Sequence, residues 1–329
     1  MAIHILKAGL LDTIQDSGRY GFQHLGINPG GAMDITAMKL ANALLGNELN
    51  EAVLEMHFPA AEIVFEDGGL VALGGADFGA EINGEVLPVL HPVMIPQNGV
   101  LRFRKQQSGA RVYLAVKGGY HTDSWLQSNS THIKAKAGGF EGRALQKNDR
   151  LLCKQSFTDL LTDTTPKIFH WSVNPAGFYL KDTVSFIPGA EYHSLTKQSL
   201  QKLETGSFSI TQQSDRMGYR LRGEILSLRS QKEMISTAVT KGTIQLLPDG
   251  QLIVLMADHQ TIGGYPRIGQ VISAGFAALA QMRAGEKIGF LKSDLMQAET
   301  LLFDQERNLQ QLQNACNFRL NEYLNSQKQ

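Results

Sequence analysis

Short apolar runs bounded by glycines dominate the chain and predict a mainly β protein. Runs rich in β-branched, aromatic and leucine residues that end at turn residues are typical of strands. The predicted strands cover residues 62–65, 70–75, 100–104, 111–119, 183–189, 207–211, 243–247 and 251–257. The Leu-Pro-Asp-Gly sequence at 247–250 predicts a hairpin turn between the last two.

Three segments instead have apolar residues at helical spacing. Residues 33–45 predict a helix that stops at Gly46, and residues 271–283 predict a shorter apolar helix. Residues 293–326 contain no glycine or proline and predict a long helix capped by Ser293-Asp294. The apolar face of this helix consists of Leu302, Leu309, Leu312, Cys316, Leu320 and Leu324. This face either packs on the chain's own body or docks a partner.

The order of these elements predicts two tandem, related β-rich modules. A polar stretch at 155–183 is the candidate linker, which gives modules at 1–160 and 165–292 and a C-terminal helix at 293–329. Residues 55–77 can be aligned with 236–258, and residues 18–22 with 215–219, in the same order. We therefore predict a duplicated module, with a helix inserted in the first copy.

Composition narrows the class of protein further. The 329 residues are enough for two domains, and 31 basic residues balance 31 acidic ones, so the charge does not favour nucleic acid or an anionic membrane as partner. Cys153 and Cys316 stand in no metal-binding or disulfide pattern, so no metal is expected. No apolar run is long enough to span a bilayer and no signal peptide is recognisable, which favours a cytoplasmic protein.

Three glycine-containing polar stretches are candidates for the chemistry. In residues 13–34 Arg19 lies between glycines and Asp34 begins a helix, a pattern that suits a carboxylate or phosphate ligand or simply a turn with a cap. Residues 214–223 hold three arginines around Gly218, on a site or on a solvated strand face. Residues 257–269 follow a buried strand and carry Asp258 as candidate base and Tyr265 as candidate acid. P-loop, GxSxG and HExxH motifs are absent from the sequence.

Seven segments together resemble one family, in order and at its spacing. They are TIQDSGRYGFQHLGINPGGAMD, LANALLGNELNEAVLE, ALGGAD, YLAVKGG, GGFEGRAL, SDRMGYRL and GTIQLLPDGQLIVLMADHQTIGGYPRIG. The chain resembles the C-type 5-oxoprolinase subunit, also called allophanate hydrolase subunit 2. The same family includes carboxyltransferase domains of urea amidolyase and an antagonist of a sporulation-kinase inhibitor. The resemblance covers about residues 5–292 and implies cyclophilin-like barrels.

The resemblance also implies a function and a set of partners. The chain would act with the B-type subunit of the same complex and a third hydrolase subunit to open 5-oxoproline to L-glutamate at the expense of ATP, and would be inactive alone. The alternatives are a carboxyltransferase component acting on urea or a related amide, which would need biotin, and a non-enzymatic antagonist of a kinase inhibitor. The sequence has no Met-Lys biotin attachment motif, since Asp34 stands where the lysine would be.

The polar residues of the family pattern are expected to line a cleft between the modules. The catalytic candidates are Asp258, Tyr265 and Asp34. The substrate-binding candidates are Gln15, Asp16, Arg19, Glu55, Asp77, Arg216, Tyr219 and Thr261. Two positions depart from the pattern: Gly275 replaces the usual Asp, and Gly30-Gly31 replaces the commoner Ser-Gly.

Overall fold

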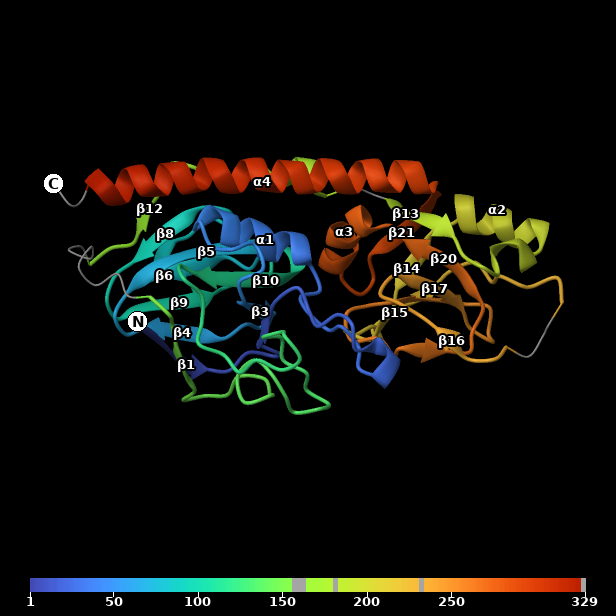
Figure 1. The fold of residues 1–329 in the computed structure, drawn as a ribbon, viewed down its shortest axis with the longest axis horizontal. Coiled ribbons are helices and arrows are strands. Elements are labelled where there is room, and N and C mark those ends of the chain that lie inside the picture. The colour runs from blue at the N-terminus through green and yellow to red at the C-terminus, as the bar shows by residue number, and fades with distance from the viewer. Residues whose placement is uncertain (156–163, 180–182, 231–233, 327–329) are drawn as a thin grey trace. The chain divides into compact units, whose positions relative to one another are not determined.

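The chain folds into two compact units that are not continuous in sequence. A computed structural model describes residues 1–155, 164–179, 183–230 and 234–326. Unit 1 consists of Met1–Gly18, Asp34–Pro175 and Glu306–Gln329, and unit 2 consists of Arg19–Met33 and Ala176–Gln305. Figure 1 shows the elements of both units along the chain. The glycine-rich segment near the start of the chain therefore belongs largely to the second unit.

Unit 1 is built from two antiparallel six-stranded sheets. The first has the order β11 (Arg150–Leu152), β1 (Ala2–Lys7), β4 (Glu62–Phe65), β9 (Gly99–Phe103), β6 (Ala80–Ile82), β7 (Glu85–Val86). The second has the order β12 (Lys167–Ile168), β8 (Pro92–Ile95), β5 (Gly69–Asp77), β10 (Ser108–Val116), β3 (Val53–His57), β2 (Thr13–Gln15). Side chains of both sheets, among them Ile63, Leu101, Leu54 and Leu114, share one core.

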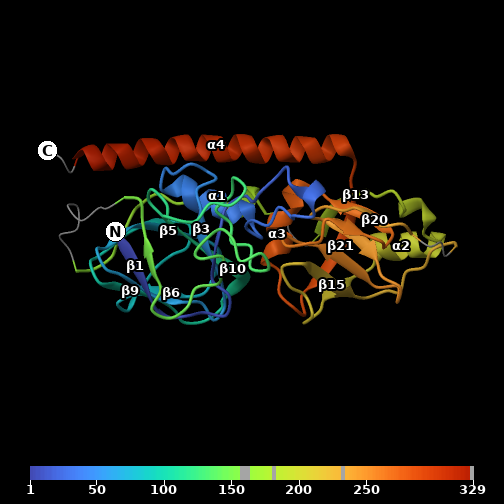
Figure 2. The same cartoon turned by 60° about the horizontal axis from the view of Figure 1, so that its bottom comes forward.

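Helix α1 (Ile35–Leu44) packs on β5 and β10 of the second sheet (Figures 1 and 2). The helix lies close to the sheet: a Cβ atom on Gly74 would be only 2.5 Å from the carbonyl oxygen of Ala37. With a helix on one face and the first sheet on the other, β10 is buried along Arg111–Val116. This explains why that strand has a continuous apolar sequence rather than an alternating one.

Unit 2 contains a closed barrel of seven strands. Their order is β13 (Thr183–Pro188), β20 (Arg267–Val271), β17 (Thr243–Leu246), β18 (Leu252–Leu255), β15 (Gly218–Arg222), β14 (Phe208–Ile210), β21 (Lys287–Lys292). A parallel pairing of β13 with β21 closes the barrel, while the other pairings are antiparallel. A separate ribbon pairs β16 (Thr237–Ala238) with β19 (Ile262–Gly263). The mainly β prediction and each predicted strand are confirmed.

The apolar helix predicted over 271–283 is wrong in its first part. Val271 is the last residue of β20 and pairs with Phe186, so it belongs to the barrel. A 3₁₀ turn, η5 (Ser273–Gly275), follows, and α3 covers only Phe276–Gln281. Pairing across the barrel therefore overrode the helical spacing. Helix α2 (Lys197–Thr205), which the sequence did not predict, is capped by Thr196, whose side chain accepts from Ser199 N.

The long C-terminal helix is confirmed as α4 (Leu295–Ser326), which begins after Asp294 as its sequence predicts. Within unit 1, Leu309, Cys316 and Leu320 are its buried side chains. Lys39 pairs with Glu306 at 2.6 Å, and Gln313 donates to Asn47 O at 2.7 Å. In the part of α4 that lies in unit 1, the apolar face therefore packs on the chain's own body. Leu302, at the other end of the predicted face, is exposed.

The predicted linker and the predicted internal repeat are both more complex in the structure than in the sequence. Within the candidate linker, β12 pairs with β8 and extends a sheet of unit 1, while residues 156–163 and 180–182 lie outside the described part. In the proposed repeat, β4 and β17 occupy corresponding places. However, β4 and β5 belong to different sheets, whereas β17 and β18 pair with each other. The duplication stays a prediction.

Candidate functional site: a guanidinium and carboxylate cluster in unit 2

The centre of the candidate site is an ion pair between Arg216 and Asp258. Arg216 Nε donates to Asp258 Oδ2 at 2.8 Å, and Nη2 donates to Oδ1 at 3.1 Å. The main chains also meet, because Asp258 N donates to Arg216 O at 2.7 Å. The arginine side chain is 7% exposed and the aspartate side chain 32%. A two-point pair of this kind fixes the plane of the guanidinium as well as its position.

The glycine-rich loop 19–33 closes on this pair within unit 2. Arg19 N donates to Pro29 O at 2.8 Å, and Arg216 Nη2 donates to Gly31 O at 2.7 Å. Gly30 has a φ of 62°, a left-handed conformation that glycine adopts without steric cost. A Cβ at Gly30 would lie 3.0 Å from Arg19 Nη1 and 3.8 Å from Asp258 Oδ1. Arg19 and Asp258 therefore approach the same point of the loop.

Positive charge exceeds negative charge in this cluster. Lys241 Nζ donates to Met33 O at 3.0 Å and to Ala32 O at 3.3 Å, which adds a third cation at the end of the loop. His259, beside Asp258, is 1% exposed; burial lowers its pKa, so it does not supply a further charge near neutral pH. Three cations around one carboxylate suit an anionic ligand such as a carboxylate or a phosphate. We call Arg19, Arg216, Asp258 and Lys241 the cationic cluster.

In unit 1, Asp34 and Glu55 meet through Tyr113. Tyr113 Oη donates to Glu55 Oε2 at 2.9 Å and accepts from Asp34 N at 2.8 Å. Asp34 Oδ1 also accepts from Ala37 N at 2.9 Å, as the N-cap of α1. Burial raises the pKa of Tyr113 well above its usual value, with Glu55 and Asp34 adding to the shift, so the hydroxyl stays protonated. These contacts join α1 to the sheet.

Asp16 and Gln15 are also engaged inside unit 1. Asp16 Oδ1 accepts from Gly18 N at 2.8 Å and from the hydroxyls of Ser128 and Ser130 at 2.7 and 2.5 Å, and Oδ2 accepts from Asn129 N at 2.7 Å. Gln15 Nε2 donates to Thr13 Oγ1 at 2.9 Å. Asp16 therefore anchors the segment 128–130 to the turn that precedes Arg19.

The remaining predicted residues have other surroundings. Asp77 Oδ1 accepts from Gly79 N at 2.8 Å and closes the turn after β5. Tyr219 is 2% exposed in the core of the barrel. The carbonyl of Thr261 accepts from Val239 N at 3.0 Å, and Tyr265 is 43% exposed.

The predicted residues thus divide between the units: Arg19, Arg216, Tyr219, Asp258, Thr261 and Tyr265 lie in unit 2, and Gln15, Asp16, Asp34, Glu55 and Asp77 lie in unit 1. Their roles, and the cleft expected between the modules, stay predictions. Sequence reasoning missed Lys241 and Tyr113. The only signal for Tyr113 was a tyrosine within an otherwise apolar strand sequence.

Two kinds of feature are missing from the described residues. In residues 1–155, 164–179, 183–230 and 234–326, no three or more His, Cys, Asp or Glu side chains gather as a metal ion would require. No helix in these same ranges is both long and apolar enough to cross a membrane.

Comparison with known proteins gives the context of this site. The family described as carboxyltransferase domain, subdomain A and B, matches residues 25–292. The chain is 36% identical to the C-type 5-oxoprolinase subunit of Escherichia coli over 94% of its length and 97% of the relative's. It is 34% identical to the Haemophilus influenzae protein of the same name over the same shares. The crystal structure of K. lactis urea amidolyase matches 94% of the chain with a TM-score of 0.85 and 21% identity, a likeness of fold; the chain spans about a fifth of that protein.

Proposed function

We propose that this chain, which belongs to the family of carboxyltransferase subdomains A and B, serves as the C-type subunit of a 5-oxoprolinase. Two relatives of nearly full-length similarity carry that name. The complex would open the lactam of 5-oxoproline to L-glutamate and consume ATP. In this reaction the ring C–N bond breaks, a water oxygen joins the carbonyl carbon, and the nitrogen gains a proton.

The observation that carries the proposal is the cationic cluster. Arg216 is held in one orientation by Asp258 and by Gly31 O, and Arg19 and Lys241 flank the same glycine loop. Oriented guanidinium groups hold a carboxylate or phosphate oxygen with little reorganisation. In this proposal they bind an anionic group of the substrate or of a phosphorylated species. Because both oxygens of Asp258 contact Arg216, its first task is to orient that arginine.

ATP would bind to the assembled complex. The sequence contains no P-loop, and we assign any contact of this chain with a phosphate to the cationic cluster. The B-type subunit and a third hydrolase subunit would supply the remaining parts, in the cytoplasm where ATP is available. Biotin enters only in the second candidate function, that of a carboxyltransferase component acting on urea or a related amide. The family description is the observation that supports this second candidate.

The test is ATP-dependent release of glutamate from 5-oxoproline by the purified three-subunit complex. Arg216→Ala should lower turnover at least a hundredfold, because the oriented fork of donors is lost. Arg216→Lys should recover only part of it, since lysine keeps the charge but not the two-point geometry. Arg220→Ala, which removes an exposed arginine of β15, is the matched control and should leave turnover unchanged.

Thermal unfolding of each variant separates loss of the site from loss of the fold. Full turnover by a folded Arg216→Ala complex would show that the site is elsewhere. Absence of glutamate release by the wild-type complex, together with urea-dependent consumption of ATP in the presence of bicarbonate and a biotin carboxylase, would favour the carboxyltransferase function instead.

A further inference from the structure

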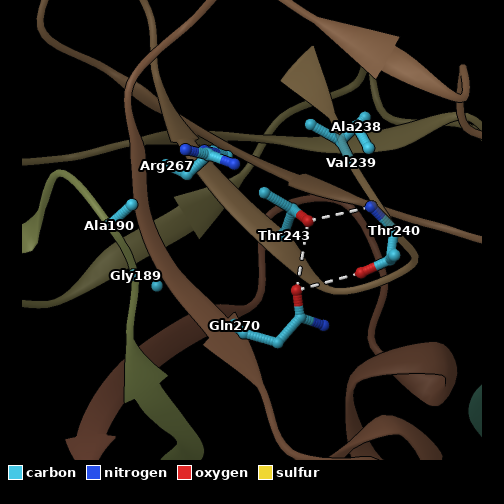
Figure 3. Close-up of a pocket in the computed structure, with 9 residues that line it drawn as sticks. Gly189, Ala190, Ala238, Val239, Thr240, Thr243, Arg267 and Gln270 are labelled. Atoms are coloured by element: carbon cyan, nitrogen blue, oxygen red, sulfur yellow. Dashed lines mark hydrogen bonds between the residues drawn. The ribbon is translucent and has the colours of Figure 1, made fainter.

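A small polar pocket lies on the outer face of the barrel in unit 2, and none of its lining residues belongs to the cationic cluster. Figure 3 shows it between β20, the start of β17 and the segment 238–240. Its volume is about 220 Å³, below the ~300 Å³ at which drug-sized ligand sites begin, so it suits a single small metabolite. The lining residues are Gly189, Ala190, Ala238, Val239, Thr240, Thr243, Arg267, Gly269 and Gln270.

Strand alternation explains why polar side chains face this pocket. Ile244 is fully buried in the barrel core, so its neighbour Thr243 points to the outer face of β17. Thr243 is paired with Gln270 across β17 and β20, which brings the hydroxyl and the amide together. The ribbon of β16 and β19 carries Ala238 and covers the same side.

The amide of Gln270 fixes the direction of two hydroxyl protons. Its Nε2 donates to Lys241 O at 2.7 Å and to Val271 O at 3.4 Å. Both partners are carbonyl oxygens, which can only accept, so the nitrogen and the oxygen of this amide cannot be exchanged. Oε1 therefore accepts from Thr240 Oγ1 at 3.2 Å and from Thr243 Oγ1 at 3.1 Å, as the dashed lines in Figure 3 show.

Thr240 consequently presents an acceptor to the pocket. A hydroxyl that donates its one proton retains two lone pairs. One lone pair of Thr243 already accepts from Thr240 N at 3.1 Å. The side chain of Thr240 is exposed at the pocket, so its lone pairs can accept a hydrogen bond from an N–H group of a ligand.

Arg267 supplies the complementary donor. Its Nε and Nη2 donate to Glu191 Oε2 and Oε1, each at 3.1 Å, and the arginine side chain is 29% exposed. Glu191 offsets the positive charge, and its two side-chain contacts use Nε and Nη2, so Nη1 is the terminal nitrogen that we assign to an acceptor oxygen of a ligand. The pocket therefore combines one acceptor, one donor and the apolar side chains of Ala190, Ala238 and Val239, with little net charge.

We infer that this pocket binds the amide group of a small neutral lactam or amide, with its N–H on Thr240 and its C=O on Arg267. This inference rests on the proposed function, in which the ligand is the lactam ring of 5-oxoproline. Thr240 of the pocket directly precedes Lys241 of the cationic cluster in the sequence.

Ligand-observed NMR titration of the full chain tests the inference with three probes. These are 5-oxoproline, 2-pyrrolidinone, which keeps the lactam and lacks the carboxylate, and N-methyl-2-pyrrolidinone, which lacks the N–H. The first two should bind, and N-methylation should weaken binding about five- to tenfold, the range of one hydrogen bond. Failure of 2-pyrrolidinone to bind, or equal binding of the N-methyl compound, would overturn the inference.

Variants assign the effect to the pocket. Thr240→Val keeps the shape of an exposed side chain and removes the acceptor, so the preference for the N–H lactam should disappear. Thr240→Ser, the matched control, should retain it. Arg267→Lys keeps a cation beside Glu191 but removes the second terminal nitrogen, and should weaken both lactams. A Thr240→Val chain with the wild-type preference would contradict the assignment.

The same variants separate this inference from the proposed function. In the assembled complex, Thr240→Val should raise the KM for 5-oxoproline about five- to tenfold. An unchanged KM in an active complex would overturn the pocket and leave the 5-oxoprolinase function standing. Binding of 2-pyrrolidinone by a chain whose complex releases no glutamate would overturn the function and leave the pocket standing.

Discussion

Gly30 links backbone conformation to the chemistry of the site at the scale of a single residue. Its φ of 62° excludes most side chains, and the space where a Cβ would lie is bordered by Arg19 Nη1 and Asp258 Oδ1. A residue with a side chain would therefore strain the loop and displace one of the charged groups. The guanidinium of Arg19 and the carboxylate of Asp258 border the space that the glycine leaves open.

Gly30→Ala should destabilise the chain by about 1–2 kcal/mol and lower glutamate release by the complex at least tenfold. The first effect is the cost of a left-handed conformation, and the second is the crowding of Arg19. Gly26→Ala is the control, because Gly26 has a φ of 78° but nothing within 4 Å of the added atom. Unfolding curves and initial rates measure the two effects. Equal loss of activity in both variants would rule out crowding at Arg19.

Asp12 gives the folded chain a dependence on pH. The side chain is 1% exposed, and burial raises its pKa from 3.8 to about 7, although Gly9 N donates to Oδ2 at 2.8 Å. Between these values the folded chain holds a proton that the unfolded chain has released. The stabilising contribution is thus complete below about pH 4 and is lost as the pH rises through 7.

Asp12→Asn should remove this dependence. Relative to the wild type, the variant should gain stability as pH increases from 4 to 8, by about 4 kcal/mol at 1.36 kcal/mol for each pKa unit. The measurement is the difference in free energy of unfolding between the two proteins at several pH values. A constant difference over that interval would show that the carboxyl group titrates alike in both states.

At the scale of the element, α1 is positioned by one tyrosine of the neighbouring strand. Tyr113 contacts Glu55 of β3 and the main chain of Asp34 together, and all three residues are fully buried. The cap at Asp34 is local and can be predicted from sequence, since an aspartate before an apolar helical stripe is a common start. The tyrosine contact joins residues 58 and 79 positions apart, and no local pattern reveals it.

Tyr113→Phe should destabilise the chain by about 2–3 kcal/mol, because a buried carboxylate and a buried N–H each lose their contact with the hydroxyl. Tyr120→Phe is the matched control. Its hydroxyl is equally buried, and its one hydrogen bond within the described residues is to Leu114 O, so about 1 kcal/mol should be lost. Chemical denaturation compares the two. Similar losses would mean that the link to Asp34 and Glu55 carries no extra stability.

At the scale of the whole molecule, the proposed activity depends on other chains. The described residues hold the cationic cluster and a small pocket, and the sequence has no P-loop. The purified chain should therefore release no glutamate from 5-oxoproline and ATP, whereas addition of the B-type and third subunits should restore release. Omission of each added component in turn is the control. Turnover by the chain alone would refute its role as a dependent subunit.

The sequence by itself determined the local elements: each strand of the prediction, the stop of α1 at Gly46 and the start of α4 after Asp294. These depend on side-chain period and on caps, which act over a few residues. The tertiary structure decided which unit the loop 19–33 joins and which charges meet there, since Arg216 reaches Asp258 and Gly31 across 42 and 185 positions. It also made residue 271 part of a barrel strand instead of a helix, by pairing Val271 with Phe186. Such contacts follow from closing the barrel, which periodicity within one segment does not encode.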